Sequence, residues 1–217
     1  MEQTKFTGDF YDEQYFLNGK KSGKGWLENY RFLPRRTIKE SLAFIDTLNL
    51  DENSKVLEVG CAFGFLVKCM RFLQIPTSGC DISEYALSHA PAGCYNLSDE
   101  KNWKILEECG FTHIIIKDML EHLTPDQLKE TMEKLAKIAP KMMVVVPMGN
   151  NGKYRIPEYH MEVSHLIAED EEWWEEEFEN SGWKITSQYE HVWGLKDNWF
   201  HVCPNGNRVF LLERKEK

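Results

Sequence analysis

The chain has 217 residues, of which 42% are hydrophobic and 28% charged, and its formal net charge is −9. This length suits one globular domain, and the composition argues against a disordered or a membrane protein. The acidic balance also argues against a tight grip on nucleic acid, which needs clustered Lys and Arg.

No apolar run approaches the ~20 residues that span a bilayer, and the first residues lack the layout of a secretory signal. The six cysteines are scattered without a C-x-x-C pair, which argues against a zinc knuckle or a disulfide framework. We therefore expect a cytoplasmic protein with reduced thiols. It should act as a monomer or homodimer with no membrane or nucleic-acid partner.

The first 34 residues differ from the rest of the chain. Aromatic side chains, among them Tyr11, Tyr15 and Tyr30, alternate with glycines there. This composition favours an aromatic-rich arm or lid over a regular element. The alternative is that the aromatics cover one edge of a sheet. We divide the chain into an arm at residues 1–34 and a domain at residues 35–217.

From residue 35 onward, segments with helical spacing alternate with strand-like apolar runs. The run Ile114, Ile115 and Ile116 predicts a strand buried on both faces, and Thr124 before Pro125 predicts a capped helix start. Successive strand and helix units imply parallel strands with right-handed crossovers. The expected elements are helix 35–48, strand 55–60, helix 65–73, strand 77–82, a short helix from 83, a weak strand 93–96, strand 112–117, a helix from 125 and strand 141–146.

The last third of the chain predicts one helix and a final pair of strands. Residues 169–181 form a very acidic helical pattern that Gly182 closes in the expected C-cap position. Residues 183–192 and 208–214 predict strands, and no helical pattern lies between them. We therefore expect these strands to pair as an antiparallel hairpin.

The strongest chemical signal lies at the turn after the first strand. Gly60 and Gly64 flank this turn, and Asp81 closes the second strand. Glycines let a ligand approach the backbone, and an acid in this place can accept hydrogen bonds from two ribose hydroxyls. A cofactor that contains a nucleoside is therefore expected. Gly60, Ala62 and Gly64 do not supply the three glycines of a dinucleotide fingerprint, so a ligand without pyrophosphate fits better.

The run from Val56 to Phe65 resembles the first motif of class I S-adenosylmethionine-dependent methyltransferases, especially their small-molecule branch. The resemblance extends through residues 79–83 and 118–123 to the final hairpin. It implies an α/β fold with a Rossmann-like, seven-stranded, mostly parallel sheet, helices on both faces and a C-terminal antiparallel β-hairpin. The implied cofactor is S-adenosyl-L-methionine, with S-adenosyl-L-homocysteine as the product.

The resemblance also assigns site residues. The implied cofactor-binding residues are Glu58, Gly60, Cys61, Ala62 and Gly64 at the first turn, Asp81 and Ile82 at the ribose and adenine, Asn96 and Leu97 at the adenine edge, and Asp118 and Met119 at the methionine end. Members of the family often have an acid near position 96, where this chain has an amide. The expected substrate contacts are Tyr11, Tyr15, Tyr30 and Tyr159.

Three histidines are candidates for catalysis. Loops at the carboxyl ends of parallel strands line the ligand crevice, and His122, His160 and His165 are expected in such loops. A hydroxyl acceptor would benefit from a base, and His165 is preferred because related sugar methyltransferases often carry a histidine in this segment. For His122 the alternative is a packing role. Another alternative is a divalent ion held by His160, Glu162 and His165, but their spacing matches no specific motif, so no metal is expected.

The resulting hypothesis is transfer of a methyl group to an oxygen of a small polar metabolite, with a sugar or sugar-nucleotide of surface polysaccharide biosynthesis as the first candidate. Within the same enzyme class, the alternatives are N-methylation and methylation of a phosphate-type or carboxylate oxygen. From another class comes a non-catalytic scaffold that binds a nucleoside without turnover.

Overall fold

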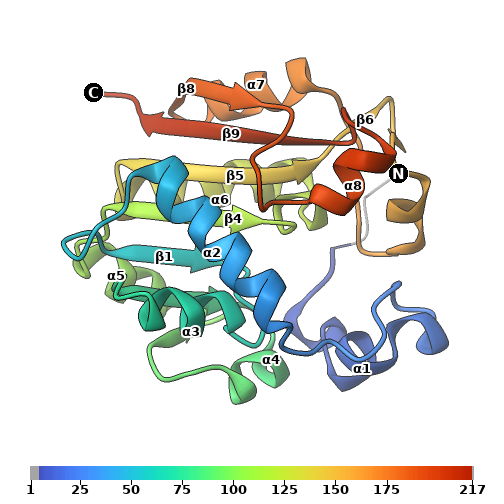
Figure 1. Ribbon diagram of the computed structural model, residues 1–217, viewed down its shortest axis with the longest axis horizontal. Coiled ribbons are helices and arrows are strands. Elements are labelled where there is room, and N and C mark those ends of the chain that lie inside the picture. Colours follow the sequence, from blue (N-terminus) through green and yellow to red (C-terminus); the bar gives the residue numbers. More distant parts are fainter. Residues whose placement is uncertain (1–4, 217) are drawn as a thin grey trace.

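A computed structural model describes residues 5–216, which form a seven-stranded sheet between two layers of helices (Figure 1). The strands of this sheet are β1 (Val56–Val59), β2 (Thr77–Asp81), β3 (Cys94–Asn96), β4 (His113–Lys117), β5 (Lys141–Pro147), β8 (Trp183–Tyr189) and β9 (Asn207–Arg214). Their order is β3-β2-β1-β4-β5-β9-β8, and a separate small ribbon pairs β6 (Gly149–Asn150) with β7 (Lys153–Tyr154). The expected Rossmann-like sheet is confirmed.

Helices lie on both faces of the sheet (Figure 1). The α-helices are α1 (Glu13–Ser22), α2 (Pro34–Leu48), α3 (Phe65–Phe72), α4 (Glu84–His89), α5 (Glu100–Glu108), α6 (Pro125–Ile138), α7 (Glu171–Asn180) and α8 (Asp197–Val202), and the 3-10 helices are η1 (Gly8–Phe10), η2 (Leu120–His122) and η3 (Pro157–Met161). Helices α2 and α3 pack on one face, while α5, α6 and α7 pack on the other.

The centre of the sheet is β4, which pairs in parallel with β1 on one side and β5 on the other. Ile114, Ile115 and Ile116 are each 0% exposed, because successive side chains point to opposite faces and helices cover both. Ile115 joins the cluster that includes Phe44 of α2, and its two neighbours join the cluster that includes Met132 of α6. The prediction of a central buried strand is confirmed.

Local sequence signals explain where helices begin on the α6 side. The Thr124 side chain accepts a hydrogen bond from the backbone N–H of Gln127, and Oε1 of Gln127 accepts one from the backbone N–H of Thr124, which completes the expected capping box. Helix α5 was not predicted. The Asp99 side chain caps it by accepting a hydrogen bond from the backbone N–H of Lys101, and Leu106 is buried on the face of α5 that packs against the core.

The N-terminal arm contains a regular helix, so the expectation of an irregular arm was wrong. Asp12 caps α1 by accepting from the backbone of Tyr15, and Gly23 ends it in the left-handed conformation at φ 71°. The helix is kinked at Asn18, where φ is −140°. A short apolar face, with Phe16 only 5% exposed, packs it against the domain.

The C-terminal strands pair as expected but are joined differently. Strand β9 lies between β5 and β8 and is antiparallel to both. The connection contains α8, so the prediction of a connection without a helix was wrong. The sequence of α8 has no repeating apolar pattern, and the helix was therefore not predicted. Lys196 precedes this helix with φ 58°, and Leu195 beside it is 1% exposed. Leu195 anchors the connection in the α2 cluster.

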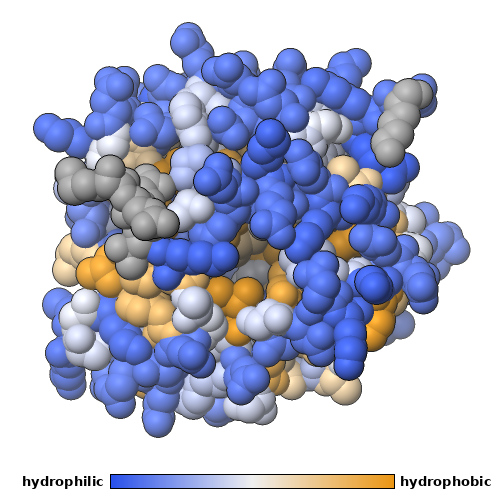
Figure 2. Space-filling model, turned by 180° about the vertical axis from the view of Figure 1, so that it is seen from behind, coloured by the Kyte–Doolittle hydropathy of each residue, from blue (hydrophilic) through white to orange (hydrophobic). Residues whose placement is uncertain are grey.

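The parallel strands β1, β2 and β4 all end at one edge of the sheet, which is where ligand crevices form in such folds. Figure 2 shows a mostly hydrophilic surface on the opposite side from Figure 1, with hydrophobic residues gathered in a band across its middle. In the described part of the chain, no helix has both the length and the apolar character needed to cross a bilayer.

Candidate active site

The turn after β1 holds its shape through left-handed backbone conformations. The φ angles of Gly60, Ala62 and Gly64 are 78°, 46° and 64°. A Cβ atom on Gly60 would lie 2.6 Å from Cγ of Met119, so a side chain there would collide with the segment after β4. The close approach of the turn to Met119 therefore requires glycine at position 60.

Asp81 is the carboxylate that faces this turn. Its Oδ2 accepts a hydrogen bond from the backbone N–H of Ala62 at 2.8 Å, and Oδ1 accepts one from Ser83 at 2.9 Å. Burial raises the pKa of Asp81 above its ordinary value, and these backbone donors oppose that effect. Each oxygen keeps a further lone pair, so the carboxylate can still accept from two ligand hydroxyls.

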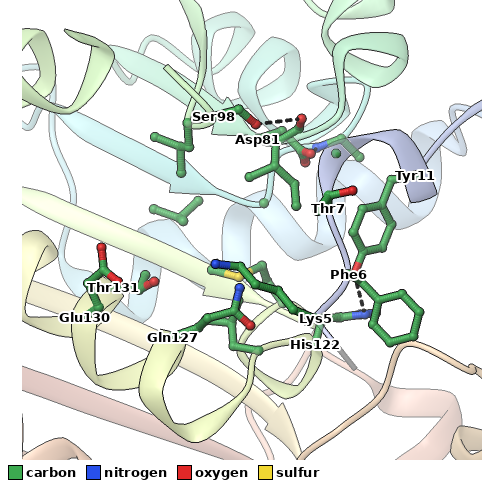
Figure 3. A pocket seen from close by; sticks show the side chains of 18 of the residues that line it. Lys5, Phe6, Thr7, Tyr11, Asp81, Ser98, His122, Gln127, Glu130 and Thr131 are labelled. Atoms are coloured by element: carbon green, nitrogen blue, oxygen red, sulfur yellow. Dashed lines mark hydrogen bonds between the residues drawn. The ribbon is translucent and has the colours of Figure 1, made fainter. Parts of the chain in front are cut away.

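A cavity of about 470 Å³ opens between the turn, the arm and α6 (Figure 3), within the range of small-molecule sites. Many residues expected at the site line it: Gly60, Ala62, Asp81, Ile82, Leu97, Asp118, Met119, His122, Tyr11 and Tyr15. In Figure 3 the phenol of Tyr11 points toward His122, and its oxygen lies 3.5 Å from Nδ1 of that ring.

Other expected residues stand behind the cavity wall or away from it. Those that do not line it are Glu58, Cys61, Gly64, Asn96, Tyr30, Tyr159, His160 and His165. Glu58 is still notable, because its Oε2 is buried without a hydrogen-bond partner among residues 5–216 and burial raises its pKa well above the ordinary value. Asn96 uses its side chain to accept from the backbone of Ser98.

Several lining residues were missed by sequence reasoning. The arm contributes Lys5, Phe6, Thr7, Gly8 and Phe16. Helix α5 contributes Trp103, and helix α6 contributes Gln127, Glu130, Thr131 and Lys134. The arm carries no periodic signal before Asp12. Asp99, an N-cap residue, was the sequence signal that could have predicted α5 and therefore the position of Trp103.

Asp118 follows β4 in a left-handed conformation, with φ 55°. Its Oδ2 lies 2.9 Å from Nζ of Lys117, and its Oδ1 lies 2.5 Å from Nζ of Lys196. Burial alone would raise the pKa of Asp118, but the two ammonium groups lower it well below its ordinary value. Asp118 is therefore an ionised carboxylate whose charge is already balanced by protein groups.

His122 and His165 lie together although 43 positions separate them, and their ring centroids are 4.7 Å apart. Burial lowers the pKa of His122 to about 4 and that of His165 to about 2, so both rings are neutral at neutral pH. Beside them, burial raises the pKa of Glu121 to about 8. Only His122 of these three lines the cavity.

The third candidate histidine lies apart from this pair. His160 is exposed, and its Nε2 accepts a hydrogen bond from the backbone of Tyr154 at 3.0 Å. Tyr159 is buried, where its hydroxyl donates to Asn207 at 2.8 Å. The structure therefore does not bring His160 to the cavity, and the alternative ligand set of His160, Glu162 and His165 is not assembled.

No protein-family model matches the chain. Over 110 residues it is 31% identical to a ubiquinone biosynthesis O-methyltransferase of Thiobacillus denitrificans, a match that covers 46% of this chain. The chain spans about half the length of this curated relative, since the match covers 47% of it.

Solved structures are similar over most of the chain. The magnesium protoporphyrin IX methyltransferase of Synechocystis with bound S-adenosylhomocysteine superposes with a TM-score of 0.60 at 14% identity, covering 95% of this chain and 97% of that one. An S-adenosylmethionine-dependent methyltransferase of Clostridium acetobutylicum gives 0.59 at 13% identity, covering 85% and 93%. This chain therefore has the class I fold of the S-adenosylmethionine-dependent methyltransferases.

Proposed function

We propose that this protein transfers a methyl group from S-adenosylmethionine to an oxygen atom of a small polar metabolite. The observation that carries the proposal is the Asp81 carboxylate, which lines a cavity of about 470 Å³ beside the glycine turn. The O-methyltransferase relative from Thiobacillus denitrificans supports the same reaction class.

The residues at the turn fit the cofactor. Asp81 would accept from the ribose hydroxyls, Ile82 and Leu97 offer apolar surface to the adenine, and Gly60 leaves the backbone open beside Met119. Glu58 stands behind the cavity wall, and its Oε2, without a hydrogen-bond partner among residues 5–216, would reach a donor such as the cofactor's amino group only if the turn after β1 shifted. When bound, the cofactor supplies an electrophilic methyl group, so the protein's main tasks are to align an acceptor and exclude water.

The acceptor would enter beside Tyr11 and His122. Both line the cavity. The His122 ring is neutral at neutral pH, so one of its ring nitrogens can accept a hydrogen bond from an acceptor hydroxyl. Arm residues line this side of the cavity and would exclude water if the arm covers the acceptor. Within this class, a sugar or sugar-nucleotide is the first acceptor to test.

The test is release of S-adenosylhomocysteine in the presence of an acceptor panel. Sugars, sugar-nucleotides and phenols offer hydroxyl oxygens, and matched amines, carboxylates and phosphate esters represent the alternatives. We expect turnover with at least one hydroxyl acceptor and the methylated product in its mass spectrum. Turnover with amines alone would reject O-methylation, and cofactor binding with no turnover on any acceptor would favour a scaffold.

A further inference from the structure

Backbone hydrogen bonds bring three potential metal ligands together at the cavity wall, where His122 lines the cavity and Glu121 and His165 lie behind it. The carbonyl oxygen of Glu121, in η2, accepts from the backbone of Leu166 at 2.7 Å and of Ile167 at 3.1 Å. This contact holds His165 against His122. One ligand atom from each of Glu121, His122 and His165 lies within 4.8 Å of the other two.

The hydrogen bonds of His165 leave one ring nitrogen with a free lone pair. Its Nδ1 lies 3.0 Å from the carbonyl oxygen of Tyr159. Because a carbonyl only accepts, Nδ1 carries the proton and Nε2 keeps its lone pair. Nε2 lies 3.9 Å from Oε1 of Glu121. A metal-binding histidine typically donates its other ring N–H to the protein in this way.

His122 is held by a similar chain of contacts. Its Nδ1 lies 2.8 Å from Oγ of Ser164, and that hydroxyl donates its own proton to Oε1 of Glu162 at 2.9 Å. The hydroxyl oxygen must therefore accept from Nδ1, which leaves Nε2 as the basic nitrogen. Carboxylate and hydroxyl together fix the tautomer that a metal ion requires.

The carboxylate of Glu121 independently indicates that a positively charged or hydrogen-bonding ligand belongs beside it. Its side chain is 1% exposed, and Oε2 has no hydrogen-bond partner among residues 5–216. A buried carboxylate oxygen without a partner is costly. The ammonium group of Lys196 makes its ion pair with Asp118 and offsets only a small part of the effect of burial on Glu121.

We propose that Glu121, His122 and His165 bind a divalent transition-metal ion. Two imidazoles and one carboxylate favour ions such as Zn²⁺, Co²⁺, Fe²⁺ or Mn²⁺ over Mg²⁺ and Ca²⁺, which prefer oxygen ligands. Ligands at about 2.1 Å from an ion stand about 3–4 Å from one another, so side-chain shifts of about 1 Å would close the site. This replaces the sequence-based expectation that the protein has no metal.

The role of the ion rests on the proposed function. His122 lines the cavity, so an ion held by three side chains would turn its open coordination positions toward the acceptor. Coordination lowers the pKa of a bound hydroxyl. The two histidines would then serve as ligands, and the ion would orient and acidify the acceptor oxygen.

Co²⁺ binding to the chelator-stripped 217-residue chain tests the site directly. Equilibrium dialysis with metal analysis should give about one Co²⁺ per chain, and Mg²⁺ should bind at least about tenfold more weakly. Glu121→Gln and His165→Ala should each weaken Co²⁺ binding at least about tenfold. His201→Ala, which removes an exposed histidine in α8, should bind as the wild type does.

Binding of S-adenosylhomocysteine to the same variants reports whether they fold. Glu121 and His165 do not line the cavity, so their variants should keep this affinity. A wild-type protein that binds less than about one-fifth of an equivalent of Co²⁺ would overturn the proposal, as would unchanged Co²⁺ binding in both variants. Co²⁺ binding without any S-adenosylhomocysteine binding would support the metal site and reject the proposed function.

Discussion

Asp81 is the single residue on which cofactor binding should depend most. Asp81→Asn keeps the shape of the side chain but removes the charge that would accept from the ribose. Because a hydrogen bond to a charged group contributes about 1.5–3 kcal/mol, the variant should bind S-adenosylhomocysteine at least about tenfold more weakly by calorimetry. Asp126→Asn, in the first turn of α6, is the matched control and should be unchanged. Equal affinities for Asp81→Asn and wild type would reject the ribose assignment.

Sequence reasoning predicted which residues lie together where the order of the strands sets their neighbours, and cofactor binding by those residues stays a prediction. Gly60 directly follows β1 and Asp81 ends β2, and these strands are adjacent and parallel, so the proximity of the two residues follows from strand order and register. The cluster of Glu121, His122 and His165 could not be predicted, because it depends on a loop contact between segments far apart in sequence. Spacing along the chain suggested His160 as the partner of His165, whereas the ring of His122 occupies that place.

Among the helices and strands, α7 is held to neighbouring segments by ion pairs, and their contribution to stability can be tested. Glu171 in its first turn pairs with Arg155 at 2.6 Å and Arg208 at 2.5 Å. The hydrogen bond from Arg155, aided by Arg208, lowers the pKa of Glu171 to about 2 against burial. A carboxylate with a lowered pKa stabilises the folded state above its unfolded pKa of 4.5, and this contribution is lost as the pH falls toward 2.

Glu171→Gln should therefore lower the free energy of unfolding by about 1–2 kcal/mol at pH 7, after allowance for solvent screening, and by less than half as much near pH 3. Urea unfolding at the two pH values measures this difference. Glu176→Gln removes the same charge from an exposed position of α7 and should have little effect at either pH. An equal loss at both pH values for Glu171→Gln would show that the ion pairs do not anchor the helix.

The elements that escaped prediction share a physical reason. Few positions of helices α1, α5 and α8 carry a repeating apolar pattern: a kink at Asn18 interrupts α1, α5 buries only Trp103 and Leu106, and α8 buries no residue. Tertiary contacts and caps stabilise such short helices more than intrinsic propensity does. The strands of the main sheet and helices such as α2, α3 and α6 were predictable because burial on one or both faces imposes a repeating apolar pattern.

At the scale of the whole molecule, the arm supplies part of the cavity lining. A Cβ atom on Gly8 would lie 2.2 Å from the carbonyl oxygen of Ile82, and Ser83 donates a hydrogen bond to the carbonyl oxygen of Tyr11. The arm therefore rests on the end of β2, beside the proposed ribose site. That it also covers the acceptor remains a prediction.

Gly8→Val should displace the arm, because the added side chain would collide with the carbonyl group of Ile82, directly after β2. We expect S-adenosylhomocysteine affinity to fall about three- to tenfold and cleavage within the arm by a protease to become faster. Asp9→Val, at an exposed neighbouring position, is the control and should leave both measurements near wild type. If Gly8→Val matched the wild type in both, the arm would have no part in closing the cavity.

The most direct measurement is calorimetric titration of the wild-type protein with S-adenosylmethionine and with S-adenosylhomocysteine. A nucleoside pocket between Gly60 and Asp81 predicts saturable binding of about one molecule per chain and a rise in the melting temperature. The absence of both heat and thermal shift with either ligand would contradict the pocket, and with it the proposed methyl transfer.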